Sequence, residues 1–391
     1  MIPCQRHLFD IPEGVSYLNC AYMSPLMRSA LDAGRIGLER KARPWEIHSE
    51  DFFNREEDFR GLAAQLLGCT ADDIAIIPSA SYGISTAALN LPIKTGQSIL
   101  VLDEQFPSNY YPWDRLAREK GAKVIVVPWP EDGDWTPGVL RALNDNVAIA
   151  ALPHVQWTSG GVLDLVRIGE ACRRKGTALV LDLTQSLGAF PFDAQAVQPD
   201  FAVAATYKWL LGPYSYGVMY VAPKWQQGRP LDENWILRDN ARDFSGLVVY
   251  TDGYEPGARR FDMGERSNFV LLPVAVRALE QILTWGVQEI SDTVAALTRR
   301  LIDGTAELGW STPPDRLRGP HYVCLRSAEP PPESLMQQLA KERIYVSVRG
   351  GTSIRVTPHV YNSEEDIDRL LQVLKQNAPR AKKQISFAGK D

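Results

Sequence analysis

A lysine and an aspartate each follow an apolar stretch of the kind that forms a buried strand. Lys208 comes shortly after the apolar run 201–205, and the chain turns soon afterwards at Gly212-Pro213. Asp182 follows the run 178–181, which is apolar throughout, as is typical of a central parallel strand. A desolvated lysine can form a Schiff base with an aldehyde, and a carboxylate can pair with a protonated pyridine nitrogen. The two residues therefore suit pyridoxal phosphate (PLP) bound at the carboxyl edge of an α/β sheet.

The residues around this pair resemble a known family. Asp182-x-x-Gln185, then an apolar strand, Tyr207-Lys208 and Gly-Pro, is similar to the class V aminotransferases, a family of fold-type I PLP enzymes. That family includes cysteine desulfurases, kynureninases and isopenicillin N epimerases, and the resemblance covers nearly the whole chain. It implies an α/β fold with a mainly parallel seven-stranded sheet and a smaller α+β C-terminal domain. We expect an N-terminal arm at 1–15, a large PLP-binding domain at 16–258 and the small domain at 259–391.

A turn of small hydroxyl residues follows the predicted strand 74–77. Ser79, Ala80 and Ser81 precede a helix that we expect from about 84 to 91. Hydroxyl residues at such a place are commonly only helix caps. The free N–H groups of a helix start also bind phosphate, and the resemblance implies that these three residues hold the phosphate of PLP.

Aromatic and amide side chains are predicted to complete the cofactor site. Phe106, in Phe-Pro-Ser-Asn, resembles the kynureninase loop and is expected to stack on the pyridine ring. The resemblance assigns Gln185 to the ring oxygen of the cofactor and Tyr207 to its phosphate. Trp157 departs from the family pattern, and its indole can donate a hydrogen bond but cannot accept one. His154 is more typical of a structural histidine at a strand end.

Two residues are predicted to contact the substrate. Arg355 lies in Ile-Arg-Val-x-Pro followed by Tyr361-Asn362, which resembles the C-terminal signature of the family. In that signature the arginine holds the α-carboxylate of an amino acid with its planar fork. Asn19 lies in a segment that resembles a family stretch passing close to the active site, although a local backbone role is equally consistent.

The loop 259–268 resembles one that reaches the neighbouring subunit's phosphate in the family. Ser267 and Asn268 are its candidates, and on this basis we expect a homodimer with shared active sites.

Composition indicates a soluble enzyme without affinity for nucleic acid or membranes. The 391 residues are 45% hydrophobic and carry a formal net charge of −5. The basic group at 380–383 is predicted to be a solvated tail. The start of the chain lacks the apolar core of a signal peptide, and the five cysteines include no C-x-x-C pair, so we expect a cytoplasmic protein without a metal site.

The resemblance implies a reaction on an α-amino acid through an external aldimine, with Lys208 as the base. Transamination is our first choice, because it needs only the lysine, the aspartate and the arginine. An epimerase or a side-chain lyase remains the alternative, and a non-catalytic PLP-binding protein is the alternative of another class. Cysteine desulfuration is not expected, since no cysteine follows Cys324, and Gln185 replaces a histidine that kynureninases carry.

The hydrophobic pattern predicts the elements that position these residues. Further strands are expected at 98–102, 123–127, 147–152, 217–222 and 322–325. Helices are expected at about 26–43, 51–67, 163–175, 271–286, 287–308 and 333–342.

Overall fold

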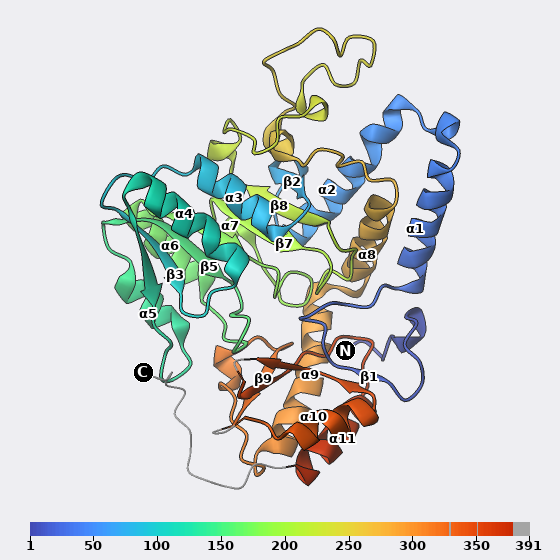
Figure 1. Cartoon of the computed structure of the whole chain (residues 1–391), viewed down its shortest axis with the longest axis vertical. Coiled ribbons are helices and arrows are strands. Elements are labelled where there is room, and N and C mark those ends of the chain that lie inside the picture. Colours follow the sequence, from blue (N-terminus) through green and yellow to red (C-terminus); the bar gives the residue numbers. More distant parts are fainter. Residues whose placement is uncertain (328–329, 350, 378–391) are drawn as a thin grey trace.

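Seven strands form the central sheet of the molecule, seen in the computed structural model of the chain (Figure 1). The structure describes residues 1–327, 330–349 and 351–377, so the basic group at 380–383 lies outside the described residues. The sheet order is β2-β8-β7-β6-β5-β3-β4. Its strands are β2 (Ile74–Ile77), β3 (Ser98–Leu102), β4 (Lys123–Val127), β5 (Val147–Pro153), β6 (Ala178–Asp182), β7 (Phe201–Ala205) and β8 (Gly217–Val221).

The sheet is mainly parallel, as predicted. All pairs from β7 through β4 are parallel, and only β8 runs antiparallel to both of its neighbours, β7 and β2. The carboxyl ends of β5, β6 and β7 therefore meet at one edge. Open α/β sheets bind their ligands at this edge.

Helices cover both faces of the sheet, which explains why its strands are apolar on both sides. One face packs on α3 (Ala80–Asn90) and α4 (Tyr111–Lys120). The other face packs on α2 (Asn54–Leu67), α5 (Trp135–Ala142), α6 (Leu165–Lys175), α7 (Ala194–Val197) and α8 (Leu271–Trp285), with α1 (Arg28–Lys41) beside α8. Within the described residues, no helix combines the length and the apolar character needed to cross a bilayer.

The C-terminal part has a core of its own. An antiparallel sheet of order β11-β12-β9 packs on three helices. Its strands are β9 (Val323–Arg326), β11 (Ser347–Arg349) and β12 (Ser353–Val356), and its helices are α9 (Val287–Thr305), α10 (Glu333–Lys341) and α11 (Glu364–Gln376).

Contacts cross the boundary that we expected between the large domain and the small domain. Strand β1 (Ser16–Tyr17) pairs in parallel with β10 (Ile344–Tyr345), and α8 belongs to the core of the large sheet. The division into 1–15, 16–258 and 259–391 remains a proposal.

One predicted boundary was wrong in a way that matters for the site. Helix α3 begins at Ala80, not near residue 84. Ser79 is thus the N-cap, and Ala80 and Ser81 belong to the first turn of the helix. The residues predicted to hold phosphate are therefore the helix start itself.

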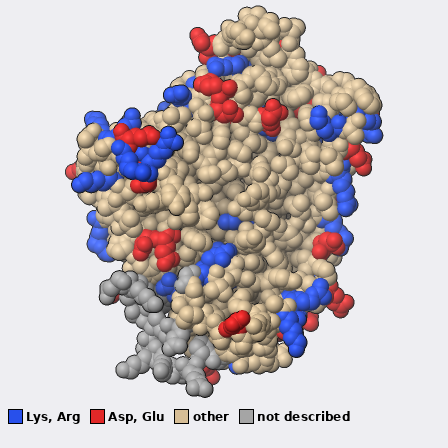
Figure 2. All heavy atoms as spheres, in the orientation of Figure 1, with Lys and Arg blue, Asp and Glu red and all other residues tan. Residues whose placement is uncertain are grey.

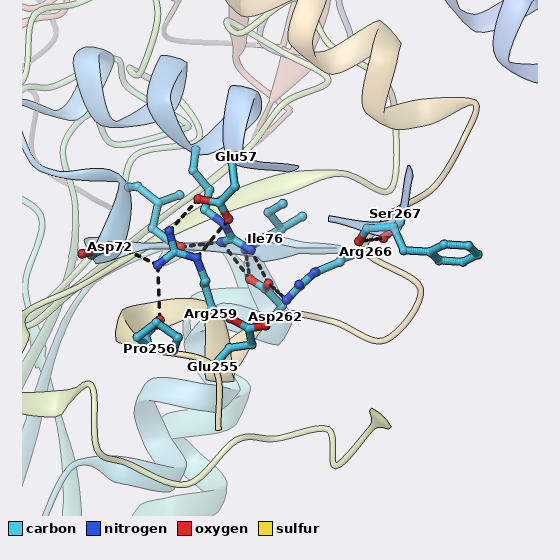
Figure 3. A network of polar contacts seen from close by, with 12 residues as sticks. Glu57, Asp72, Ile76, Glu255, Pro256, Arg259, Asp262, Arg266 and Ser267 are labelled. Carbon is cyan, nitrogen blue, oxygen red and sulfur yellow. Dashed lines mark hydrogen bonds and ion pairs between the residues drawn. The ribbon is translucent and has the colours of Figure 1, made fainter. Parts of the chain in front are cut away.

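A buried ionic network anchors β2, the edge strand that leads into this turn (Figure 3). The Asp262 carboxylate is fully buried and accepts hydrogen bonds from the Ile76 N–H at 2.7 Å and from Arg266 Nη1 at 2.6 Å. Arg60, also fully buried, donates to the same carboxylate and to the Ile74 carbonyl at 2.5 Å. The network thereby fixes the register of β2 against the loop 256–267.

Candidate active site

A cavity of about 250 Å³ opens at the carboxyl ends of β5, β6 and β7. Eight of the ten residues predicted for the site line it: Ser79, Ala80, Ser81, Phe106, Asp182, Gln185, Tyr207 and Lys208. They come from four separate stretches of the chain, at 79–81, 106, 182–185 and 207–208, and the sheet topology brings them together.

Lys208 is nearly buried in this cavity, with 6% of its surface exposed. Burial lowers the pKa of its amine from 10.5 to about 8, against the opposing effect of the nearby Asp182 carboxylate. Its Nζ atom lies 5.5 Å from the ring centroids of both Phe106 and Tyr207. At neutral pH a usable fraction of this amine is therefore unprotonated, as a nucleophile or base requires.

Asp182 ends β6 and is held by the residue two positions further on. Its Oδ1 atom accepts a hydrogen bond from the Thr184 N–H at 2.9 Å. Burial raises the pKa of this carboxyl, while hydrogen bonds from Thr184 and the charge of Lys208 act in the opposite direction. A buried carboxylate in this situation is stabilised by a cationic partner such as a protonated ring nitrogen.

The start of α3 forms one side of the cavity. Ser79 accepts a hydrogen bond from the Tyr82 N–H at 3.2 Å, and its hydroxyl lies 2.9 Å from that of Ser81. The Gly83 N–H makes the first bond of the helix, to the Ser79 carbonyl at 3.4 Å. The N–H groups of Ala80 and Ser81 precede it and remain available for an anion.

Aromatic rings also line the cavity. Phe106 packs edge-on against Trp157, with ring centroids 5.4 Å apart and an interplanar angle of 84°. The Trp157 indole donates its hydrogen to the Glu104 carbonyl at 2.7 Å, so that hydrogen is not available to a ligand. Tyr207 packs against Tyr214 at 4.6 Å, and burial raises the pKa of Tyr207 to about 12. Neither Trp157 nor Tyr207 is therefore suited to be a proton acceptor.

Arg355 and Asn19 are not among the residues that line the cavity. Arg355 is buried and contacts Trp157, a residue that does line the cavity. Its Nη1 atom donates to the Tyr322 hydroxyl at 3.1 Å and to the Trp157 carbonyl at 3.4 Å. Its Nε atom is buried without a partner among the described residues. Asn19 lies next to the C-terminal sheet and accepts a hydrogen bond from Ser347 at 2.7 Å.

The other candidates lie away from the cavity. His154 stacks on Phe190 at 4.9 Å, and burial lowers the pKa of its imidazole to about 3. Ser267 donates to the Phe52 carbonyl at 2.8 Å, and Asn268 accepts from the Leu271 N–H at 2.8 Å. In the described residues no group of His, Cys, Asp or Glu has an arrangement that could hold a metal ion.

Sequence reasoning missed several residues of the cavity. Five polar or aromatic side chains also line it: Thr184, Gln105, Ser108, Tyr214 and Ser215. Thr184 could have been found, because it stands between Asp182 and Gln185 at the end of the same strand. Ser215 has a φ of 63°, a left-handed conformation in the turn after Lys208, and no sequence signal marks it.

Comparisons with known proteins agree with this geometry. The family model for aminotransferase class V matches residues 45–370. An uncharacterized aminotransferase of Bacillus subtilis, YcbU, is 26% identical over 328 residues, covering 81% of this chain and 82% of the relative. The isopenicillin N epimerase of Amycolatopsis lactamdurans is 23% identical and covers 95% of this chain and 97% of its own.

The fold is also found among solved structures. A variant of C-DES with glycine covalently linked to its PLP cofactor superposes with a TM-score of 0.85 at 20% identity, covering 95% of this chain and 99% of that one. At this identity the likeness concerns the fold, whereas the family model matches more than three quarters of the sequence. The chain therefore belongs to the aminotransferase class V family.

Proposed function

We propose that this protein is a PLP enzyme that transaminates an α-amino acid, with Lys208 as the base. The observation that carries the proposal is the meeting of Lys208, Asp182 and the α3 start in one cavity of about 250 Å³.

The donor set fits PLP. The α3 start offers free N–H groups to a phosphate, and Asp182 offers a buried carboxylate to a cationic ring nitrogen. When bound, PLP supplies an electrophilic carbon for amines and a conjugated ring that accepts the electron pair left at the substrate Cα. Family membership supports the same assignment.

The residues of the chain divide the remaining tasks. Lys208 holds the cofactor between turnovers, and its amine then takes the proton from the substrate Cα. Asp182 keeps a positive charge on the ring nitrogen. Phe106 packs against the ring, and Arg355 holds the substrate α-carboxylate once the Trp157 wall adjusts. We propose phosphate contacts for Ser79, Ala80, Ser81 and Tyr207. We also propose a ring-oxygen contact for Gln185 and a substrate contact for Asn19.

Transamination is favoured over inversion by the set of titratable groups. The titratable residues that line the cavity are Asp182, Lys208, Tyr207 and Tyr214. Transamination can take the Cα proton and return a proton on the same face of the bound substrate, which needs one base. Inversion at Cα needs a second group on the opposite face of the substrate. Burial holds the pKa of Tyr207 near 12, which makes it a poor second base. Epimerisation remains the second candidate, because the epimerase relative aligns over nearly the whole chain.

Cysteine desulfuration is not proposed. Burial raises the pKa of Cys324, the last cysteine in the sequence, to about 12, and Cys20 has the same shift for the same reason. A thiolate, not a thiol, is the nucleophile that desulfuration requires.

We further propose a homodimer in a cytoplasmic setting. The segment that projects at the top of Figure 1 exposes Val248, Val249 and Tyr250 by 80%, 69% and 94%. Apolar side chains exposed together in this way are typical of a surface covered by a partner. Light scattering on the purified protein would test the oligomeric state, and a monomer at micromolar concentration would refute it.

The reaction is tested with a panel of amino acids added singly to the PLP-loaded protein. A transaminase converts its cofactor to pyridoxamine phosphate, releases a keto acid, and is returned to the starting form by a keto acid. Chromatography of the cofactor and mass spectrometry of the products measure both. Recovery of unchanged PLP together with an inverted or cleaved amino acid would replace transamination by epimerisation or lysis. An inert spectrum across the panel would favour a non-catalytic PLP-binding protein.

A further inference from the structure

We propose that Arg349 recognises a second anionic group, so that the preferred substrates are α-amino acids with an acidic side chain. This inference rests on the proposed function and names the substrate class of the same site.

The register of the β11–β12 hairpin places Arg349 and Arg355 on one face. Ser347 pairs with Arg355 and Arg349 pairs with Ser353, so the side chains of all four residues point to the same side. Arg349 is therefore the diagonal neighbour of Arg355, a spacing of about 7–8 Å in antiparallel sheets. Burial lowers the pKa of Arg349 and the charge of Arg355 lowers it further, so the two side chains are near enough to repel each other unless an anion lies between or beside them.

No acidic residue compensates these two charges among the described residues. Arg349 Nη1 donates to the carbonyl of Val348 at 2.9 Å, and the Nε atoms of both Arg349 and Arg355 are buried without a partner. Burial, and then the charge of Arg355, lower the pKa of Arg349. Partly buried cations without a counterion are costly, and binding of two anionic groups removes that cost.

Both arginines lie against the same wall of the cavity. The guanidinium carbon of Arg349 lies 5.9 Å from the centre of the Trp157 ring, and Arg355 donates to the Trp157 carbonyl. Trp157 itself lines the cavity. Figure 2 shows blue Lys and Arg atoms near the middle of the face in view.

The ligand class follows from the number of anionic partners needed. The α-carboxylate is assigned to Arg355 and the amino group reacts at the cofactor beside Lys208. Arg349 is then left for the far end of the side chain. A carboxylate matches its planar fork, and a sulfonate presents the same charge with different geometry.

A third arginine provides a matched control. Arg326 is on the same face of this sheet, because it pairs with Ser353 on the other side of β12. Its guanidinium carbon lies 4.2 Å from the centre of the Trp129 ring, and Trp129 lines a different cavity. Arg326→Gln removes the same charge from the same sheet without touching the Trp157 wall.

The first test uses the protein without added cofactor and needs no turnover. Calorimetry compares glutarate with butyrate. Glutarate carries two carboxylates, whereas butyrate carries one carboxylate and has one chain carbon fewer. We expect glutarate to bind at least tenfold more tightly in the wild type and in Arg326→Gln, and the difference to disappear in Arg349→Gln. Equal binding of the two acids by the wild type, or a difference that persists in Arg349→Gln, would overturn the proposal.

The second test uses the PLP-loaded protein. Spectral titrations compare glutamate with glutamine and aspartate with asparagine, and cysteate separates carboxylate from sulfonate recognition. We expect at least a tenfold preference for the acidic member of each pair, lost in Arg349→Gln and kept in Arg326→Gln. A site that treats both members alike refutes the substrate class while leaving the proposed function intact. If no amino acid changes the spectrum but glutarate is still preferred over butyrate, the second anion site stands and the proposed function fails.

Discussion

The Gln185 amide donates a hydrogen bond from Nε2 to the Ala21 carbonyl at 3.2 Å. Its Oε1 atom accepts one from the Trp209 indole at 3.1 Å. An indole nitrogen only donates and a carbonyl only accepts, so the orientation of this amide is determined by its partners. Nε2 retains one further hydrogen, and we propose that it is the one that binds the ring oxygen of the cofactor.

Gln185→Glu should weaken PLP binding and lower the melting temperature. The substitution keeps the shape but places a carboxylate oxygen against the Ala21 carbonyl, and an unsatisfied buried polar pair of this kind costs about 1–3 kcal/mol. Differential scanning calorimetry and a PLP titration measure the two effects. Gln195→Glu, on the exposed surface of α7, is the control, and an equal response of the two variants would contradict the role of Gln185.

Reduction of the PLP-loaded protein with borohydride should fix a pyridoxyl group on Lys208. Lys208 is the one lysine among the residues that line the cavity, and its amine has a lowered pKa. Peptide mapping by mass spectrometry locates the group. Its attachment to any other lysine would refute the assignment.

The rate at which the apoprotein captures PLP should rise with pH around a midpoint near 8. The unprotonated amine is the reactive form, and burial lowers the pKa of Lys208 from 10.5 to about 8. The rate is therefore low below the midpoint and constant well above it, as stopped-flow absorbance can follow. Asp182→Asn removes the charge that raises this pKa, so its midpoint should move lower. A wild-type midpoint near 10 would show that the amine is not desolvated.

Arg355→Lys should weaken amino-acid binding while PLP stays bound. Lysine keeps the charge but loses the planar fork, and the loss of a charge-assisted hydrogen bond of about 1.5–3 kcal/mol corresponds to roughly 10- to 150-fold in affinity. A spectral titration gives the apparent affinity, with Arg326→Lys as the control from the same sheet face. Unchanged affinity would show that Arg355 does not hold the carboxylate.

Asp262→Asn should destabilise the fold by about 3–5 kcal/mol, the usual cost of removing one member of a buried ion pair. Arg60 and Arg266 are both buried against this carboxylate. The neutral amide leaves Arg60 only its ion pair with Glu57 and removes the one ion pair that Arg266 forms among the described residues. Denaturant unfolding measures the loss. Glu119→Gln, which breaks the exposed pair with Arg115, should leave the unfolding midpoint nearly unchanged. A similar midpoint for Asp262→Asn and the wild type would contradict the anchoring role of the network.

Local pattern was sufficient to predict the strands of the large sheet, whereas its mainly parallel arrangement was expected from the family resemblance. The strands β2, β3, β4 and β7 have the bounds predicted from apolar runs flanked by turn residues. The start of α3 was misplaced because Gly83 is a poor helix former, which moved the expected start past it. In the structure a Cβ atom on Gly83 would lie 2.5 Å from Val203 Cγ1, so the glycine is required by the close approach of α3 to the sheet. Packing overrides propensity there, and no local signal reveals it.

The candidate site likewise contains residues that sequence predicts and residues that only the packed structure brings together. Asp182 and Lys208 could be placed together from chain order, because parallel strands bring their carboxyl ends to one edge. The helix start at 79–81 and the residues Phe106, Gln185 and Tyr207 were assigned to the site by the family resemblance. The row formed by Arg326, Arg349 and Arg355 could not be predicted. It depends on the register of a hairpin and its neighbour, and a slip of one residue would turn every side chain to the other face.

The pairing of β1 with β10 has a consequence for the newly made chain. Ser16 finds its partner Ile344 only after residues 17–344 have been translated. At roughly 5–20 residues per second, that wait is on the order of tens of seconds. Until then β1 lacks its partner strand, whereas the segment after β1 already has partners in the large domain, because the Ala21 carbonyl accepts from Gln185 and the Ser24 N–H donates to the Tyr207 carbonyl. A chain still attached to the ribosome therefore contains every residue that lines the cavity, all of them between positions 78 and 215, before it contains Ile344 or Arg355. The cavity at the strand ends thus precedes the proposed carboxylate site in the growing chain.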